Sequence, residues 1–306
     1  MKIEKVYFEA TDGLQLSGIL HINEDLNNNE SVKLNKEVVL SVHGMTSNCF
    51  KKREDIFAQV FTENKVDYFC FNNRGADIMS YFERIKDGKL VGRIEAGSSK
   101  EIFEDCYYDI KGAILMLLEK GYETIYLQGH SYGSAKSVYT YQKLKQENEN
   151  KILSHIRAVS LLSIVDVPRM CQSLLGDNFV QARAYAKKLV EEGKEETLIP
   201  REYFLHPLSA KNFLFCSEIG GVIDLVPFGE KNPDFSALNS IECKIFMCWG
   251  KERDMISQAP EELEKIIRSN LKNSQLEIKF IEGTGHNYHY KEKETAEEMV
   301  KFIKGK

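Results

Sequence analysis

The sequence predicts an α/β protein with a mostly parallel sheet of eight strands that is covered by helices on both faces. Short segments that are apolar almost throughout recur along the chain, as at residues 38–42 and 244–249. Amphipathic segments with apolar residues three and four positions apart lie between them, as at residues 103–117. Strands that are apolar throughout are buried on both faces, and their alternation with helices is typical of a parallel sheet.

The beginning of the chain predicts an antiparallel pair of strands. Apolar and polar residues alternate at residues 6–10 and again at residues 14–20. The intervening Thr11-Asp12-Gly13 is a typical turn sequence. The next apolar run, residues 38–42, predicts a buried strand that ends at His43-Gly44.

The rest of the chain supplies further strands and helices, with one interruption. Strands are predicted at residues 68–71, 124–128, 158–162, 244–249 and 276–281, and helices at residues 56–61, 103–117, 135–145 and 296–303. Residues 167–236 interrupt the alternation, because they combine one helical stretch with several Pro, Gly and Phe residues. We expect this segment to be a cap inserted over the sheet, so that residues 1–166 and 237–306 form the core domain.

Composition and charge exclude several classes of protein. The 306 residues are 42% hydrophobic and 28% charged, which is enough for one large globular domain with an insertion. The formal net charge is -5, and Lys and Arg are interspersed with Asp and Glu, so nucleic acid is not an expected partner. No run of about 18 apolar residues occurs, so no membrane span is expected.

The cysteines indicate a reducing compartment. There are seven, an odd number, and none forms a Cys-x-x-Cys pair. Most stand inside apolar runs, so we expect reduced, buried thiols and a cytoplasmic protein. The absence of an apolar segment behind Met1 agrees with that location. The sequence makes no prediction of the oligomeric state.

One motif indicates a nucleophile. Residues 129–133 read Gly-His-Ser-Tyr-Gly, the pattern G-x-S-x-G, between an apolar strand and a helical segment. The pattern alone is weak, but its position at a strand-to-helix junction is specific. The glycines are needed where a strained turn packs tightly against its neighbours. The sequence therefore predicts Ser131 as a catalytic nucleophile.

A serine hydroxyl needs a base to remove its proton, and His286 is the favoured histidine. It follows the last predicted strand, at the edge of the sheet where the nucleophile also emerges. His289 is the nearest competitor and is expected on the surface, whereas His130 is expected to point away from the nucleophile. His21 and His155 are interpreted as ordinary strand or surface residues.

The acid that orients the imidazole must also follow a strand. Asp254 follows the strand at residues 244–249 through a glycine and a polar loop, and it is the favoured candidate. Asp166 directly follows another strand and is the alternative, although it could instead cap a helix that begins at Val167-Pro168. Glu252 is a weaker third candidate.

Backbone amides are expected to stabilise the negative charge that develops on the substrate oxygen. The amide of Tyr132, directly after the nucleophile, is one candidate. The amide of Met45 is the other, because His43-Gly44-Met45 leaves its strand at the same edge of the sheet.

Together these residues resemble the α/β-hydrolase superfamily. The resemblance rests on His43-Gly44 after the third strand, residues 72–75 after the fourth and residues 129–133 after the fifth, followed late in the chain by Asp254 and His286. It covers the chain outside the inserted segment and implies the α/β-hydrolase fold. One departure is Asn73, where an acidic residue usually precedes Arg-Gly. In the superfamily this loop lies near the rim of the site, so the departure bears on substrate preference.

The resemblance implies hydrolysis of an acyl bond. Ser131 attacks the acyl carbonyl, and His286 passes the proton to the leaving group and then activates the water that hydrolyses the acyl-enzyme. No cofactor or metal is expected. The pair His286-x-x-His289 lacks a nearby Cys or carboxylate that could complete a metal site.

The sequence favours a carboxylic ester hydrolase for a small-molecule acyl substrate, with an apolar pocket supplied by the cap. Thioesterase, amidase, peptidase and acyltransferase activities use the same triad and stay open. A different class, a non-catalytic protein that binds a small ligand on this fold, is the alternative, although a pure binder has no need for the base.

Overall fold

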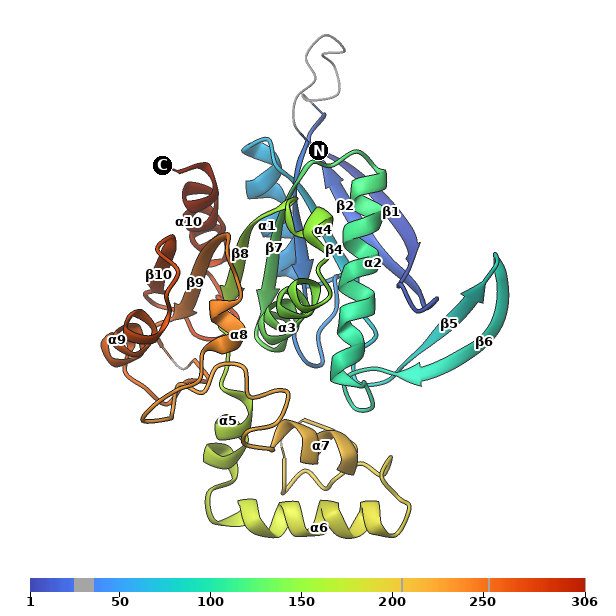
Figure 1. Cartoon of the computed structure of the whole chain (residues 1–306), viewed down its shortest axis with the longest axis vertical. Coiled ribbons are helices and arrows are strands. Elements are labelled where there is room, and N and C mark those ends of the chain that lie inside the picture. Colours follow the sequence, from blue (N-terminus) through green and yellow to red (C-terminus); the bar gives the residue numbers. More distant parts are fainter. Residues whose placement is uncertain (25–35, 205, 253, 306) are drawn as a thin grey trace.

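A computed structural model describes residues 1–24, 36–204, 206–252 and 254–305. It contains one large sheet with the strand order β1-β2-β4-β3-β7-β8-β9-β10 (Figure 1). Its strands are β1 (Lys2–Glu9), β2 (Gln15–Ile22), β3 (Glu37–Val42), β4 (Asp67–Asn72), β7 (Thr124–His130), β8 (Ile156–Leu162), β9 (Lys244–Gly250) and β10 (Leu276–Ile281). Strand β2 pairs antiparallel with β1 and β4, and the other neighbours are parallel. The predicted fold class is confirmed.

Helices cover both faces of the sheet because its strands are apolar on both sides. In β3, Val38, Leu40 and Val42 belong to one apolar cluster, whereas Val39 belongs to the other. The first cluster includes residues of α2 (Cys106–Glu119), α3 (Tyr132–Gln146) and α9 (Pro260–Asn270). The second includes residues of α1 (Lys52–Glu63) and α10 (Glu292–Lys304). The shorter helices of the core are η2 (Phe103–Asp105), α4 (Asn150–Leu153) and α8 (Ser236–Asn239).

A separate hairpin projects from the core beside β1 and β2 (Figure 1). It consists of β5 (Ser80–Lys86) and β6 (Lys89–Ala96), which pair antiparallel. The sequence interpretation missed this hairpin, although Asp87-Gly88 is a strong signal for a two-residue turn. Both turn residues have positive φ, 51° and 70°, as such a turn requires. The hairpin joins the core through the amide of Ile85, which donates to the carbonyl of Gly13 over 2.8 Å.

Residues 167–236 lie beyond the ends of the parallel strands where Ser131 emerges (Figure 1). They contain α5 (Val167–Leu175), η3 (Gly176–Asn178), α6 (Phe179–Glu191) and α7 (Ala210–Cys216). Their buried aromatic residues belong to the same apolar cluster as the sheet. The ring of Phe228 lies 6.2 Å from that of Trp249 in β9, and the ring of Phe215 lies 5.7 Å from that of Phe103. The inserted segment therefore shares its core with the sheet.

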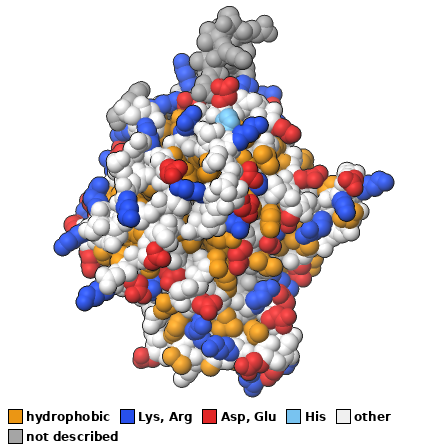
Figure 2. Space-filling view, in the orientation of Figure 1, with side chains coloured by type: hydrophobic (Ala, Val, Ile, Leu, Met, Phe, Trp, Pro, Cys, Tyr) orange, Lys and Arg blue, Asp and Glu red, His pale blue; other side chains and the backbone are white. Residues whose placement is uncertain are grey.

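The cysteines and the surface agree with a globular protein. All seven cysteines are free, and all except the half-buried Cys243 are buried. On the face shown in Figure 2, acidic and basic side chains are interspersed, with small apolar patches between them. Within the described part of the chain, no helix is both long enough and apolar enough to cross a membrane.

Candidate active site

The backbone forms a sharp turn between β7 and α3, with Ser131 at its apex. Ser131 has a φ of 55°, an unusual value for a residue with a side chain. A Cβ at Gly133 would lie 2.2 Å from the carbonyl oxygen of Val42, and one at Gly129 would lie 2.4 Å from that of Gly133. Only glycine fits at these two positions, so the G-x-S-x-G pattern follows from the packing of this turn.

The structure brings Ser131, His286 and Asp254 into one hydrogen-bonded line. Oγ of Ser131 lies 2.9 Å from Nε2 of His286, and Nδ1 of His286 lies 2.6 Å from Oδ1 of Asp254. A carboxylate only accepts, so Nδ1 carries the imidazole proton and donates it, which leaves Nε2 to accept from the serine hydroxyl. This tautomer and this orientation are those that a general base for Ser131 requires.

The carboxylate of Asp254 is held by further donors. Its side chain is 1% exposed. The Oδ2 atom lies 2.8 Å from the hydroxyl of Ser163 and accepts from the amide of Gly250 over 3.1 Å. The amide of Met255 donates to Oδ1 over 2.8 Å. Ser163 was not predicted from the sequence, and its position just after the apolar strand β8 was the only available signal.

The alternative acids, Asp166 and Glu252, and the competing base, His289, lie outside the hydrogen-bonded line at Ser131. Asp166 caps α5, since its side chain accepts from the amide of Arg169, and it also pairs with the guanidinium of Arg169 at 3.1 Å. Glu252 is exposed. His289, the competing base, has a side chain that is 76% exposed and lies 3.9 Å from a carboxylate oxygen of Glu292. None of these three residues has a hydrogen bond to Ser131 or His286 among the described contacts.

Two backbone amides lie close to the nucleophile. Tyr132 begins α3, so its amide has no acceptor within the helix. The loop after β3 passes directly beside Ser131, since a Cβ at Gly44 would lie 3.0 Å from the Cβ of Ser131. Met45 follows Gly44, and no described residue accepts a hydrogen bond from the amide of Met45 or of Tyr132. Both amides are therefore free to donate to a bound ligand.

Two buried histidines hold the loops around the site. Nδ1 of His43 donates to the carbonyl of Gly44 over 2.9 Å, and burial lowers the pKa of His43 to about 3. Nε2 of His130 donates to the carbonyl of His286 over 2.8 Å, and burial lowers the pKa of His130 well below its usual value. The ring of His130 lies 5.1 Å from that of His286, and no hydrogen bond between described residues joins the side chain of His130 to Ser131.

A pocket of about 490 Å³ opens onto Ser131 and His286. Its lining comprises Gly44, Met45, Thr46, Ser47, Lys51, Lys52, Arg53, His130, Ser131, His206, Met255, His286, Asn287, His289 and Glu292. The cap supplies little of this lining, contrary to the prediction, since His206 is the one lining residue given by residues 167–236 in the described part of the chain. Most of the lining comes from the loops after β3 and β10, and it combines apolar surface with several charged side chains.

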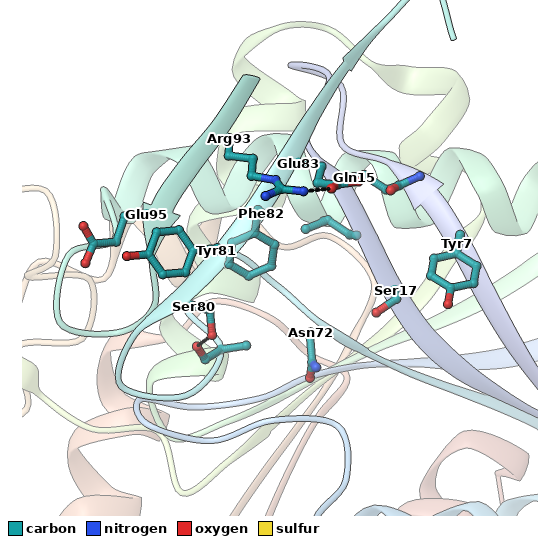
Figure 3. A pocket seen from close by; sticks show the side chains of 12 residues that line it. Tyr7, Gln15, Ser17, Asn72, Ser80, Tyr81, Phe82, Glu83, Arg93 and Glu95 are labelled. Carbon is teal, nitrogen blue, oxygen red and sulfur yellow. Dashed lines mark hydrogen bonds and ion pairs between the residues drawn. The ribbon is translucent and has the colours of Figure 1, made fainter. Parts of the chain in front are cut away.

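A larger pocket of about 910 Å³ lies between the hairpin and β1–β2 (Figure 3). Tyr81 and Phe82 face this pocket from β5 (Figure 3). Nη2 of Arg93 donates to Oε1 of Glu83 over 2.9 Å (Figure 3). Its described lining contains no histidine, and no hydrogen bond between the described lining residues joins a carboxylate to a hydroxyl, so it lacks the arrangement found at Ser131. Among the described residues, no group of three or more His, Cys, Asp or Glu is placed to hold a metal ion.

Comparisons with known proteins define the fold. A carboxyl esterase from Bacillus coagulans aligns with a TM-score of 0.66 and 13% identity over 100% of this chain and 99% of its own. Est1E from Butyrivibrio proteoclasticus, bound to ferulic acid, aligns with a TM-score of 0.62 and 15% identity over 98% of both chains. The α/β hydrolase GrgF from Penicillium sp. sh18 aligns with a TM-score of 0.63 and 12% identity over 99% of this chain and 98% of its own.

These similarities show that the chain has the α/β-hydrolase fold, as its sequence motifs had suggested. No protein-family model matches the sequence. No curated protein matches it significantly.

Proposed function

We propose that this protein is a serine hydrolase that cleaves carboxylic esters through an acyl-enzyme on Ser131. The observation that carries the proposal is the line from Ser131 through His286 to the buried carboxylate of Asp254, with separations of 2.9 and 2.6 Å. Distances in this range let the imidazole take the serine proton as the oxygen attacks the acyl carbon. The esterases among the similar structures support ester hydrolysis.

The reaction proceeds in two halves. In the first, Oγ of Ser131 bonds to the acyl carbon, His286 takes the serine proton, and the amides of Met45 and Tyr132 hydrogen-bond the resulting oxyanion. His286 then returns the proton to the leaving alkoxide, and the ester bond breaks. In the second half a water gives its proton to His286 and attacks the acyl-enzyme, which releases the carboxylic acid and restores Ser131. Asp254 keeps Nδ1 protonated and stabilises the imidazolium throughout.

The remaining features fit this role. Residues 167–236 act as a cap that contributes His206 to the pocket. No step requires a metal or an organic cofactor. The seven free cysteines favour the cytoplasm.

Covalent labelling tests the proposal directly. A fluorophosphonate probe is expected to label the wild-type protein, and Ser131→Ala is expected to abolish both the labelling and the hydrolysis of p-nitrophenyl acetate. Ser80→Ala is the matched control, since Ser80 lines the larger pocket and donates to the carbonyl of Ala76. Labelling that survives Ser131→Ala, or that is lost in Ser80→Ala, would reject the assignment.

A further inference from the structure

The pocket at Ser131 is basic, although the protein as a whole is acidic. Among its described lining residues, Lys51, Lys52 and Arg53 face the one carboxylate of Glu292, whereas the chain has a formal net charge of -5. We propose that the site selects esters that carry a carboxylate group, which these three cations bind. This inference rests on the proposed function, because it names the class of substrate for the same site.

Arg53 is the buried part of this subsite. Its side chain is only 8% exposed, yet it lines the pocket. Nε and Nη2 donate to Oε1 of Glu54 over 3.2 and 2.9 Å. No described residue accepts a hydrogen bond from Nη1, so one guanidinium nitrogen keeps its donors for a ligand. Nη1 is not among the buried unpartnered atoms of the described residues, so it is accessible, and a substrate carboxylate in the pocket would form a charge-assisted hydrogen bond with it.

Glu54 offsets part of the charge of Arg53, with which it forms an ion pair at 2.9 Å, but it leaves Nη1 without a partner among the described residues. Its second oxygen, Oε2, accepts from the hydroxyls of Ser41 and Tyr68 over 2.8 and 2.7 Å. Residues of β3 and β4 thus bind the carboxylate oxygen that accepts no hydrogen bond from Arg53, and the side chain of Glu54 is 2% exposed. Glu54 fixes the position of the guanidinium and is not among the residues that line the pocket.

The two lysines are free to meet a ligand. Lys51 and Lys52 are exposed, and no ion pair between described residues involves either of them. They stand at the beginning of α1, a helix of 12 residues whose N-cap, Lys51, supplies no side-chain cap. The helix dipole adds a partial positive charge at this end. The acidic residues of the first turn, Glu54 and Asp55, do not line the pocket.

The position of the cations couples them to the reaction. Lys51, Lys52 and Arg53 stand where the connection that carries Met45 after β3 enters α1. The segment that offers an amide to the oxyanion therefore also carries the cations. A charged substrate group held there would help to position the ester against Ser131, and the field of a basic cleft would raise the rate of capture of anionic substrates.

Matched pairs of esters test the proposal with the full-length protein. The first arm compares the 4-nitrophenyl monoester of adipic acid, which has a free acyl-side carboxylate, with its methyl ester. The second arm compares 4-butyryloxybenzoate, with its carboxylate on the alcohol side, with methyl 4-butyryloxybenzoate. Spontaneous hydrolysis is subtracted with Ser131→Ala. The wild type is expected to show kcat/KM about tenfold higher for the charged member of at least one pair, and the preference should shrink at high salt.

The double variant K51Q/K52Q measures the contribution of the two lysines separately from that of Arg53. It is expected to lower kcat/KM for the preferred charged ester by about fivefold to tenfold and to leave the neutral partner within about twofold. The control K86Q/K89Q removes the same charge from exposed positions of the hairpin and should change neither value. A second variant, R53Q/E54Q, removes the buried pair without leaving one charge unpaired, and it should reduce the preference further while thermal unfolding confirms that it is folded.

The outcomes separate the two proposals. Hydrolysis that depends on Ser131 but shows no preference for a charged ester in either arm overturns the carboxylate subsite and leaves the hydrolase intact. A preference that persists unchanged in both K51Q/K52Q and R53Q/E54Q also overturns the subsite. The absence of any Ser131-dependent hydrolysis, charged or neutral, overturns the proposed function and the subsite with it.

Discussion

The hydroxyl of Ser163 lies 2.8 Å from Oδ2 of Asp254, the carboxylate oxygen that does not contact His286. Ser163 is fully buried and has a φ of 45°, a strained value for a residue with a side chain. The hydroxyl of Tyr288 lies 2.9 Å from Oγ of Ser163 and donates to the carbonyl of Cys248 over 2.7 Å. The acid of the proposed triad is thus positioned from behind by residues of two other loops.

Removing this hydroxyl is expected to slow catalysis without weakening substrate binding. In Ser163→Ala, Asp254 loses a hydrogen bond to a buried carboxylate, an interaction of about 1.5–3 kcal/mol. Because this hydrogen-bond energy helps to hold Asp254, and through it the imidazole, in the reactive position, we expect kcat to fall at least about tenfold while KM stays within about twofold. Steady-state kinetics with p-nitrophenyl acetate measure both constants. Tyr288→Phe, which removes only the outer hydroxyl, should have a smaller effect on kcat. A rise in KM alone, or an unchanged kcat, would show that Ser163 does not position the acid.

Asp254→Asn is expected to lower kcat by about 10³- to 10⁴-fold. An amide at this position no longer fixes the imidazole tautomer that accepts the serine proton, and it cannot stabilise the imidazolium. Fluorophosphonate labelling should slow in parallel, because it depends on the same base. A variant that keeps more than a tenth of the wild-type turnover would mean that another residue orients His286.

Asp166→Asn distinguishes the two candidate acids. Asp166 caps α5 and pairs with Arg169, so the substitution removes charge from a structural contact. We expect turnover within about threefold of the wild type and a loss of about 1 kcal/mol in the free energy of unfolding. Urea titration measures the second quantity. A collapse of turnover in a folded Asp166→Asn protein would move the acid to the loop after β8.

The fold was predictable because its signals are local, and the residues of the proposed triad carry local signals as well. Apolar runs and amphipathic spacings fix strands and helices in the residues themselves, and G-x-S-x-G marks a turn that tolerates only glycine at Gly129 and Gly133. Other contacts depend on how distant loops pack. Nothing near Ser163 in the sequence indicates that it supports Asp254, and nothing near Arg53 indicates that it lines the pocket at Ser131. The hairpin, by contrast, had a readable signal in Asp87-Gly88.

Gly133→Ala is expected to destabilise the fold strongly. The new Cβ would lie 2.2 Å from the carbonyl oxygen of Val42, which is backbone and cannot rotate away. The chain must shift at the turn that carries Ser131, so we expect a loss of at least about 3 kcal/mol in the free energy of unfolding, measured by urea titration. Gly92→Ala is the control, since its added Cβ meets no atom within 4 Å. It should stay within about 0.5 kcal/mol of the wild type. Equal effects of the two substitutions would contradict the packing described at the turn.

The buried His43 predicts that stability falls in mild acid. Burial lowers its pKa to about 3 in the folded protein, whereas an unfolded histidine has a pKa of about 6.5. Above pH 6.5 both states are neutral and the full stability is present. Between pH 6.5 and 3 the unfolded chain binds a proton that the folded protein does not, so the free energy of unfolding falls by up to about 1.4 kcal/mol per pH unit for this residue. His130, whose pKa is also lowered by burial, adds to the slope.

His43→Gln isolates this contribution. Glutamine can still accept from the amide of Asn73, which lies 3.3 Å from Nε2 of His43, but it does not titrate. We expect urea titrations between pH 6 and 4.5 to give a slope for the variant that is shallower than the wild-type slope by about 1 kcal/mol per pH unit. At pH 7.5 the variant should be less stable, because the carbonyl of Gly44 loses its donor. The two curves therefore converge as the pH falls. Parallel curves across this range would mean that His43 binds its proton as readily in the folded protein as in the unfolded chain.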